Sequence, residues 1–275
     1  MKIVKKSIFP IMLALLLCAC GRTAEHRTIS DVNNLDGCRI GVNLAWEADY
    51  MLTGRKDLEL CRYDSTADML MALDHGKIDG IAIDDSTLKI VLKQVGGVEI
   101  VEPALGEIGY TVYFAPDEEE LLKDFNAFLA EWKASGDYEN YIRHIHEFDG
   151  ENYQSYELPP DGTGKTLRFA YNMDGFPRSF WDPATDEAMG YDVEVVKLWA
   201  ADRGYQLDCT ATSYTDMEKG TLIGRYQLCT GYTSDVYNID ARAAGILVSD
   251  SFGEESVHIA QMAGDTINMD QYDFD

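Results

Sequence analysis

Basic residues are scarce in this chain. Its 275 residues include 23 Lys and Arg against 48 Asp and Glu, which gives a formal net charge of -25. A chain with this balance repels nucleic acid and anionic lipid headgroups, so we expect no nucleic-acid partner. The acidic residues are spread along the whole chain, and we interpret most of them as solvated surface.

Motifs for metal binding and catalysis are also missing. The chain has no Cys-x-x-Cys pair and no Gly-x-Ser-x-Gly, and His144 and His146 have no third candidate ligand nearby. The acids Asp84 and Asp85 are adjacent, so on a strand they would point to opposite faces and could not act as a pair. We therefore predict no structural zinc, no cofactor and no enzymatic activity.

Long apolar runs are absent except near the N-terminus. Three lysines precede a short apolar run over 8–17, which is too short to span a membrane comfortably. The next residues, LCAC at 17–20, resemble a bacterial lipobox. We predict a lipoprotein signal peptide over 1–20, with Cys20 as the lipidated residue, and a tether over 21–34. The mature chain would then lie in the cell envelope, lipid-anchored to a membrane and facing the periplasm or the exterior. An ordinary N-terminal membrane anchor is the alternative.

One sequence pattern occurs twice. RYDSTADMLMALDHGKIDGIAID at 62–84 returns in weaker form as SYTDMEKGTLIGRYQLCTGY at 213–232. Each copy places Asp-Met at the start of a helix and then a glycine followed by a basic residue. A helix–turn–strand unit used twice predicts two similar α/β lobes.

The alternation of strand and helix patterns divides the chain further. In the first unit it favours a parallel sheet with right-handed crossovers. The predicted segments are an α/β unit over 35–105, a crossover strand and two helices over 106–147, a polar linker over 148–166, a second α/β unit over 167–262 and a tail over 263–275.

Four cysteines remain after Cys20, two in each unit. They are Cys38, Cys61, Cys209 and Cys229, and all four fall in predicted strands. Outside the cytoplasm three disulfide pairings are possible for four cysteines, but Cys is also an ordinary small buried residue. We favour free buried thiols, with disulfides as the alternative.

These segments resemble the family 3 extracellular solute-binding proteins, which are periplasmic receptors for amino acids and related solutes. LDGCRIGV, the 62–84 run and PALGEIGYTVYFAPDEEELLKDFNAFLAEWKASGDYENYI are similar to the family's second lobe and C-terminal segment. LRFAYNMDGFP, GYDVEVVKLWA and ARAAGILVSDSF are similar to its N-terminal lobe. The lobes thus stand in reversed order, which implies either a circularly permuted receptor or a piece of a tandem protein.

The resemblance implies a two-lobed α/β architecture of the type II periplasmic-binding-protein kind. It also implies a function: binding of an amino acid or similar small polar solute between the lobes, and delivery of that solute to an ABC permease in the inner membrane. A degenerate lobe pair that serves as a sensor or a protein-interaction module is the alternative, and a dehydratase-like enzyme is a less favoured one.

Two charged residues match the family's ligand contacts. Arg242 matches the arginine whose planar donors hold the ligand carboxylate, and Asp84 matches the acid that faces the ligand amine. Each has an ordinary alternative. Arg242 would also suit a solvated turn, and Asp84 would also suit the N-cap of the following helix.

The aromatic loop and one helix complete the predicted site. Phe176, Phe180 and Trp181 replace the family's aromatic loop and serve either as a ligand wall or as core. Pro177 of that loop is kept, whereas the two residues after it depart from the pattern. Glu194 keeps an acidic position of the family, with a structural or rim role.

The largest departure is Ala45-Trp46-Glu47, where the family presents Gly-Thr-Thr. A bulky Trp46 and an anionic Glu47 at a helix start would repel a ligand carboxylate or shrink the pocket. The sequence therefore predicts either a ligand with more positive charge or a loss of binding.

Overall fold

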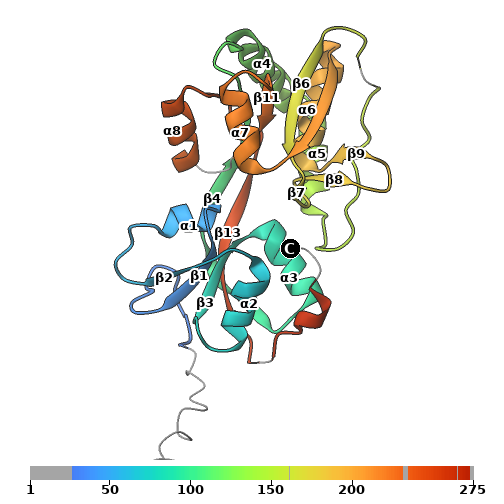
Figure 1. The fold of residues 1–275 in the computed structure, drawn as a ribbon. Coiled ribbons are helices and arrows are strands. Elements are labelled where there is room, and N and C mark those ends of the chain that lie inside the picture. The colour runs from blue at the N-terminus through green and yellow to red at the C-terminus, as the bar shows by residue number, and fades with distance from the viewer. Residues whose placement is uncertain (1–26, 161, 232–234, 265, 273–275) are drawn as a thin grey trace, which may run out of the picture.

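The computed structural model describes residues 27–160, 162–231, 235–264 and 266–272. These residues form two α/β lobes, which are joined by the paired strands β4 (Val98–Tyr110) and β13 (Gly253–Met262) (Figure 1). The two-lobed α/β fold class is thus confirmed. The predicted signal peptide, with Cys20, and the start of the tether lie outside the described residues. None of the described helices is long and apolar enough to span a membrane.

The first lobe is built on a five-stranded sheet of order β2-β1-β3-β13-β4. Strand β1 is parallel to β2 and β3, whereas β13 runs antiparallel to β3 and β4. Apolar side chains cover both faces of the sheet. Along the chain, its first elements are β1 (Arg39–Asn43), α1 (Glu47–Leu52), β2 (Glu59–Tyr63), α2 (Thr66–Asp74), β3 (Gly80–Asp84) and α3 (Asp85–Gln94).

The second lobe repeats this plan with the order β10-β6-β11-β5-β12. Three strands are parallel, and β5 stands antiparallel in the fourth place. Its strands are β5 (Val112–Phe114), β6 (Thr166–Asn172), β10 (Gln206–Thr212), β11 (Leu228–Thr230) and β12 (Leu247–Val248). Its helices are α4 (Glu119–Ala134), α5 (Gly136–His146), α6 (Tyr191–Arg203), α7 (Tyr214–Leu222) and α8 (Asp235–Ala244).

Three short elements and a turn complete the fold. The strands β7 (Asp174–Gly175), β8 (Ser179–Asp182) and β9 (Glu187–Met189) form a small sheet on the second lobe, and η1 (Met269–Gln271) follows β13. Residue Ile267 of the predicted tail is buried in the first lobe's core, so this part of the tail packs against the lobe.

The strand exchange between the halves departs from the sequence expectation. Each sheet is mixed, because its antiparallel fourth strand comes from the other half of the chain. The sequence predicts that 167–262 forms the second unit and that the crossover strand lies within 106–147, yet β13 lies in the first sheet and crosses beside β4. Local patterns specify a strand but not a partner that lies far away in the sequence.

The twofold sequence pattern does have a structural counterpart. Ser65 caps α2 and Ser213 caps α7, each accepting a hydrogen bond from the backbone amide of the Asp three residues later. Both helices are followed by a glycine with positive φ, Gly76 at 66° and Gly224 at 74°, as expected for a residue that ends a helix in the left-handed region. The repeat therefore builds the same helix–turn–strand unit in each lobe.

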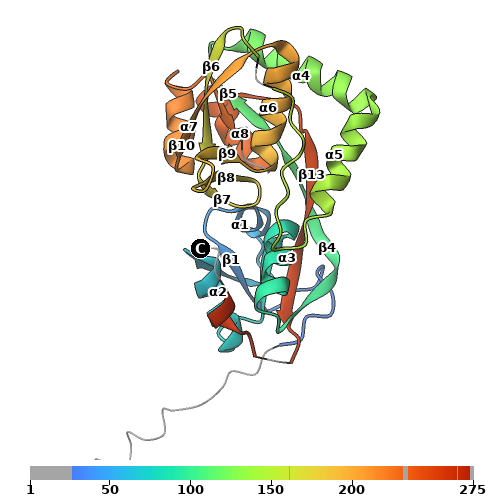
Figure 2. The same cartoon turned by 90° about the vertical axis from the view of Figure 1, so that its right-hand side faces the viewer.

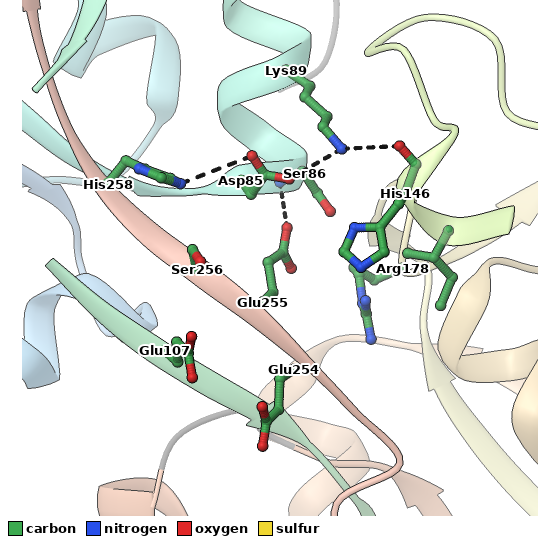
Figure 3. Close-up of a pocket in the computed structure, with 11 residues that line it drawn as sticks. Asp85, Ser86, Lys89, Glu107, His146, Arg178, Glu254, Glu255, Ser256 and His258 are labelled. Atoms are coloured by element: carbon green, nitrogen blue, oxygen red, sulfur yellow. Dashed lines mark hydrogen bonds and ion pairs between the residues drawn. The ribbon is translucent and has the colours of Figure 1, made fainter. Parts of the chain in front are cut away.

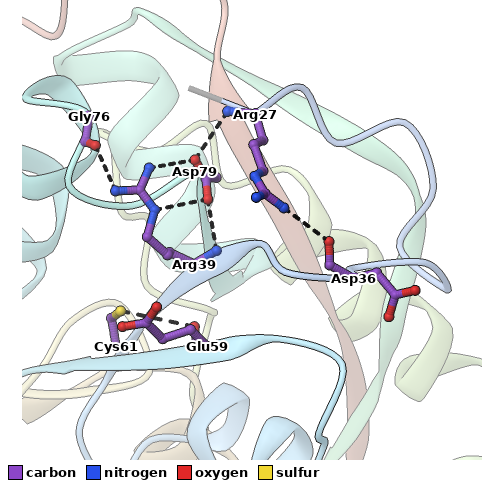
Figure 4. A network of polar contacts seen from close by, with 7 residues as sticks. All are labelled: Arg27, Asp36, Arg39, Glu59, Cys61, Gly76 and Asp79. Atoms are coloured by element: carbon purple, nitrogen blue, oxygen red, sulfur yellow. Dashed lines mark hydrogen bonds and ion pairs between the residues drawn. The ribbon is translucent and has the colours of Figure 1, made fainter. Parts of the chain in front are cut away.

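A buried ion pair fastens the first copy of this turn to β1 (Figure 4). The Arg39 guanidinium lies 2.6 Å from Oδ1 of Asp79 and donates to the Gly76 carbonyl at 3.0 Å. Asp79, only 1% exposed, also accepts from the backbone amides of Arg39 and Arg27. Burial alone would raise the pKa of Asp79, but these donors outweigh it and lower that pKa.

The second copy uses a neutral version of the same contact. Arg168 of β6 donates to the carbonyls of Gly224 and Arg225, and Gln227 accepts from the Arg168 backbone amide at 3.2 Å. Asp79 and Gln227 therefore have the same position in the two lobes. Asp79, one of the acids near the end of the 62–84 pattern, thus has a structural role.

The four cysteines outside the signal region are unbonded. Cys38 and Cys229 are buried, Cys61 is half-buried and Cys209 is exposed. The prediction of free thiols agrees with the structure, but the prediction that all are buried does not hold for Cys209, which is exposed, or for Cys61, which is only half-buried.

A segment of the predicted linker, residues 148–156, makes a further contact between the lobes (Figure 2). Gly150, with φ of 90°, lies against the α3 backbone, where any Cβ would collide with the Lys89 carbonyl oxygen. Lys93 of α3 lies 3.5 Å from Glu151. Phe148 is buried with Ile90 of α3. The linker is therefore a packed part of the molecule at this point.

Glu194 holds this segment on the second lobe. Its carboxylate, 2% exposed, accepts hydrogen bonds from the Tyr153 hydroxyl at 2.6 Å and the Tyr156 amide at 2.8 Å. The Tyr153 hydroxyl in turn accepts from the Gly190 amide at the start of α6. Glu194 thus has the structural role that the sequence offered as one alternative.

Replacing Asp79 by Ala removes the anion that two backbone amides and two nitrogens of the Arg39 guanidinium share. We expect Asp79→Ala to lower the free energy of unfolding by about 3–5 kcal/mol, because Arg39 would stay partly buried without its partner. Denaturant unfolding measures this change. The exposed pair Glu120–Lys123 on α4 offers a control, since Glu120→Ala should cost less than about 1 kcal/mol. An equally small loss for Asp79→Ala would contradict this role.

Replacing Glu194 by Ala should release residues 148–156. We expect Glu194→Ala to speed chymotrypsin cleavage after Tyr153 and Tyr156 several-fold, because both lose the carboxylate that holds them. Limited proteolysis with mass spectrometry measures the cut sites. Glu157→Ala, an exposed change in the neighbouring linker, is the control. Unchanged cleavage in Glu194→Ala would show that other contacts hold the segment.

Candidate functional site

A cavity of about 340 Å³ lies between the lobes, beside the two crossing strands (Figure 3). Its wall draws on α3 and both crossing strands, on the end of α5 and on the loop before β8. A cavity of this size is at the lower end of the range for small-molecule sites. The lining residues are Asp85, Ser86, Lys89, Glu107, Ile145, His146, Arg178, Glu254, Glu255, Ser256 and His258.

Two carboxylates occupy the N-terminus of α3 at the cavity wall. Asp84 caps the helix by accepting from the Thr87 amide at 2.9 Å. Glu255 reaches across from β13 and accepts from the Ser86 amide. Both acids are placed by the β3–β13 pairing, in which Asp84 stands opposite Val257. Two of the amides that make this helix N-terminus attractive to anions are therefore already bonded to the protein's own acids.

The pKa values of both acids are raised. Burial raises the pKa of Glu255 well above its usual range, and the charge of Asp84 raises it further. Burial likewise raises the pKa of Asp84, against the lowering effect of the Thr87 donors. Oε2 of Glu255 is buried and lacks a hydrogen-bond partner among the described residues. Asp84 and Glu255 are thus a buried carboxyl pair whose members cannot easily both be charged, and of the two only Glu255 lines the cavity.

The cavity's permanent cations are already paired. Lys89 lies 3.1 Å from Asp85, one turn earlier on α3. Arg178 pairs with the buried Asp192, and its guanidinium carbon lies 3.0 Å from the centroid of the Tyr110 ring. Four carboxyl groups line the cavity against these two cations, so its field favours positive charge.

Histidines form part of the wall as well. His258 of β13 has a side chain 13% exposed, and its Nε2 lies 4.0 Å from Asp85. Its Nδ1 is buried and has no partner among the described residues. The described residues contain no group of three or more His, Cys, Asp or Glu that could hold a metal ion.

Arg242 lies away from the cavity. It is exposed in the last turn of α8, and it does not line the cavity.

The predicted aromatic residues belong to a different cluster. The rings of Phe176 and Phe180 lie 5.1 Å apart and both pack on Tyr153 of the linker segment. Trp181 is exposed and donates to Asp186 at 3.1 Å. None of the three lines the cavity. Phe176 and Phe180 thus fix the 148–156 segment to the second lobe.

The departure at 45–47 begins with a residue in the left-handed backbone region. Ala45 has φ of 63°, a left-handed conformation that favours glycine and is costly for alanine. Trp46 follows at the N-cap of α1 with 44% of its surface exposed, and it does not line the cavity either.

None of the residues that line the cavity was predicted from the sequence as a ligand contact, and Glu255 and Arg178 are the two that matter most for its charge. Glu255 was missed because the strand that carries it was assigned to the other lobe. Arg178 was noticed only as a departure after Pro177. An arginine in an otherwise aromatic loop was the available signal for it.

Replacing Glu255 by Gln should stabilise the protein in a pH-dependent way. Because the folded pKa of Glu255 is raised above the unfolded value of about 4.3, its contribution is fully favourable below pH ~4 and is lost as the pH rises through the folded pKa. We expect Glu255→Gln to match the parent near pH 4 and to exceed it near pH 8 by more than ~0.5 kcal/mol.

Unfolding curves at pH 4 and pH 8 measure this difference, with Glu254→Gln, an exposed neighbour, as the control. A variant that is less stable than the parent at pH 8 would contradict the buried carboxyl pair.

The comparisons with known proteins concern overall fold. No family model matches the chain, and no curated protein sequence matches it. Among solved structures, an ancestral amino-acid-binding protein that is a precursor of cyclohexadienyl dehydratase is 12% identical, with 85% of this chain and 86% of that chain covered and a TM-score of 0.42.

Two further structures are similar at the same level. The GluR0 ligand-binding core in complex with L-glutamate is 10% identical, with coverage of 83% and 86% and a TM-score of 0.42. A phosphate-binding protein of a phosphate ABC transporter from Streptococcus pneumoniae is 8% identical, with coverage of 86% and 99% and a TM-score of 0.43. What those proteins bind is a property of those proteins.

Proposed function

We propose that this chain is a solute-binding protein that holds a small polar solute between its two lobes. The cavity carries the proposal, because its wall combines residues of both lobes with residues of both crossing strands. A solute in that position would contact Arg178 from one side and Ser86 and Glu255 from the other. Binding would therefore favour a closed arrangement of the lobes.

The proposed setting is the cell envelope. The N-terminal pattern supports a lipid anchor at Cys20, and the family resemblance supports delivery of an amino acid or similar solute to an ABC permease. Binding without covalent chemistry is the activity we propose, with the solute amine near Glu255, because Asp84, the acid that the resemblance implies, does not line the cavity.

We infer a circular permutation from the reversed lobe order. Both sheets have five strands in the same arrangement within the described residues, and each receives its fourth strand from the other half of the chain. Two sheets of the same plan support a two-lobed receptor whose lobes stand in reversed order along the chain.

A second candidate function is a module that binds a protein partner and no solute. Two observations favour it. Trp46 is 44% exposed, and Leu44 beside it is 49% exposed. Together they leave an apolar surface at the start of α1.

Thermal unfolding with a panel of amino acids, diamines and small peptides tests solute binding. A true ligand at a hundredfold excess over its dissociation constant should stabilise the chain by about 2.7 kcal/mol. Ser256→Trp, which fills the cavity wall, should abolish the effect, whereas Arg242→Ala should preserve it. The opposite result would place the site near α8. A cooperatively folding chain that no solute stabilises would favour the partner-binding module.

A further inference from the structure

The N-terminus of α3 bears on the charge of the solute. In a helix, the first amides are free to bind an anion, and a ligand carboxylate is commonly held there. Here the Ser86 amide donates to Glu255 and the Thr87 amide donates to Asp84. A solute carboxylate would have to displace a carboxylate of the protein, and it would meet the remaining acid at close range.

The arginines offer no better place for a carboxylate. Arg242 is exposed at the end of α8, away from the cavity. Arg178 lies at the cavity, but Asp192 takes one of its terminal nitrogens and the Tyr110 ring covers its face. Nε of Arg178 has no partner among the described residues, but Nη2 already donates to Asp192, so the fork of Nε and Nη2 is not free to hold both oxygens of a carboxylate.

Acceptors for a cation, in contrast, are present at both ends of the cavity. Asp85 begins α3 and Glu255 lies beside it, and Oε2 of Glu255 has no hydrogen-bond partner among the described residues. Glu107 and Glu254 lie farther along the crossing strands, away from α3 (Figure 3). An ammonium group has three donors and no acceptor, which suits such carboxylate-rich ends.

We propose that the solute is a small primary amine without a carboxylate, of the linear diamine class, with one ammonium at Glu255 and the other toward Glu107 and Glu254. This inference rests on the proposed function and specifies its substrate class. It also explains why Trp46 and Glu47 could replace the hydroxyl residues of the family pattern, since no solute carboxylate has to be bound there.

Isothermal titration of the full chain with matched pairs tests the inference. Putrescine and L-ornithine differ by one carboxylate, as do cadaverine and L-lysine. We expect each diamine to bind at least tenfold tighter than its amino acid. Glu255→Gln should weaken diamine binding at least tenfold while unfolding cooperatively. If that variant does not fold, Glu254→Gln supplies the same test from the other end. Glu120→Gln, exposed on α4, should bind as the parent does.

The outcomes separate the two levels of the proposal. Equal or tighter binding of ornithine or lysine would overturn the amine inference and leave solute binding intact. Binding of another solute class from the panel, without any diamine, would do the same. A folded chain that binds no solute at all would overturn both.

Discussion

The antiparallel pairing of β13 with β4 is the interaction on which the rest of the molecule depends. These strands pass from one lobe to the other side by side, and β13 also pairs with β3, so it completes the first sheet. The same pairing sets Glu255 beside the N-terminus of α3. Fold and candidate site thus share one constraint, since a change of register in this ribbon would move the acid that defines the cavity.

The site is unusual in how its charges are satisfied. A helix N-terminus and two cations would ordinarily attract an anion, but here each is matched by an acid of the protein itself. The groups that remain are carboxylates, and one of their oxygens, Oε2 of Glu255, is buried without a hydrogen-bond partner among the described residues. The electrostatic preference of the cavity therefore follows from saturation of its donors and does not require the large overall negative charge of the chain.

Short-range sequence features were enough to predict most of the fold. The caps at Ser65 and Ser213 and the glycines at 76 and 224 are short-range features, and they fix the repeated unit in both lobes. The lobe exchange of β13 could not be predicted in this way, because strand partners are chosen by packing between distant segments. The candidate site could not be predicted in full for the same reason. Asp84 was identified from its own strand, whereas Glu255 reaches it only through that exchange.

A crystal structure of the chain grown with putrescine tests the central claim most directly, namely that a small solute binds between the lobes at the crossing strands. The account predicts the diamine in the cavity, with one nitrogen within hydrogen-bond distance of Glu255 and contacts from both lobes. A diamine found only on the outer surface, for example near α8 or Trp46, with the cavity filled by side chains, would contradict it.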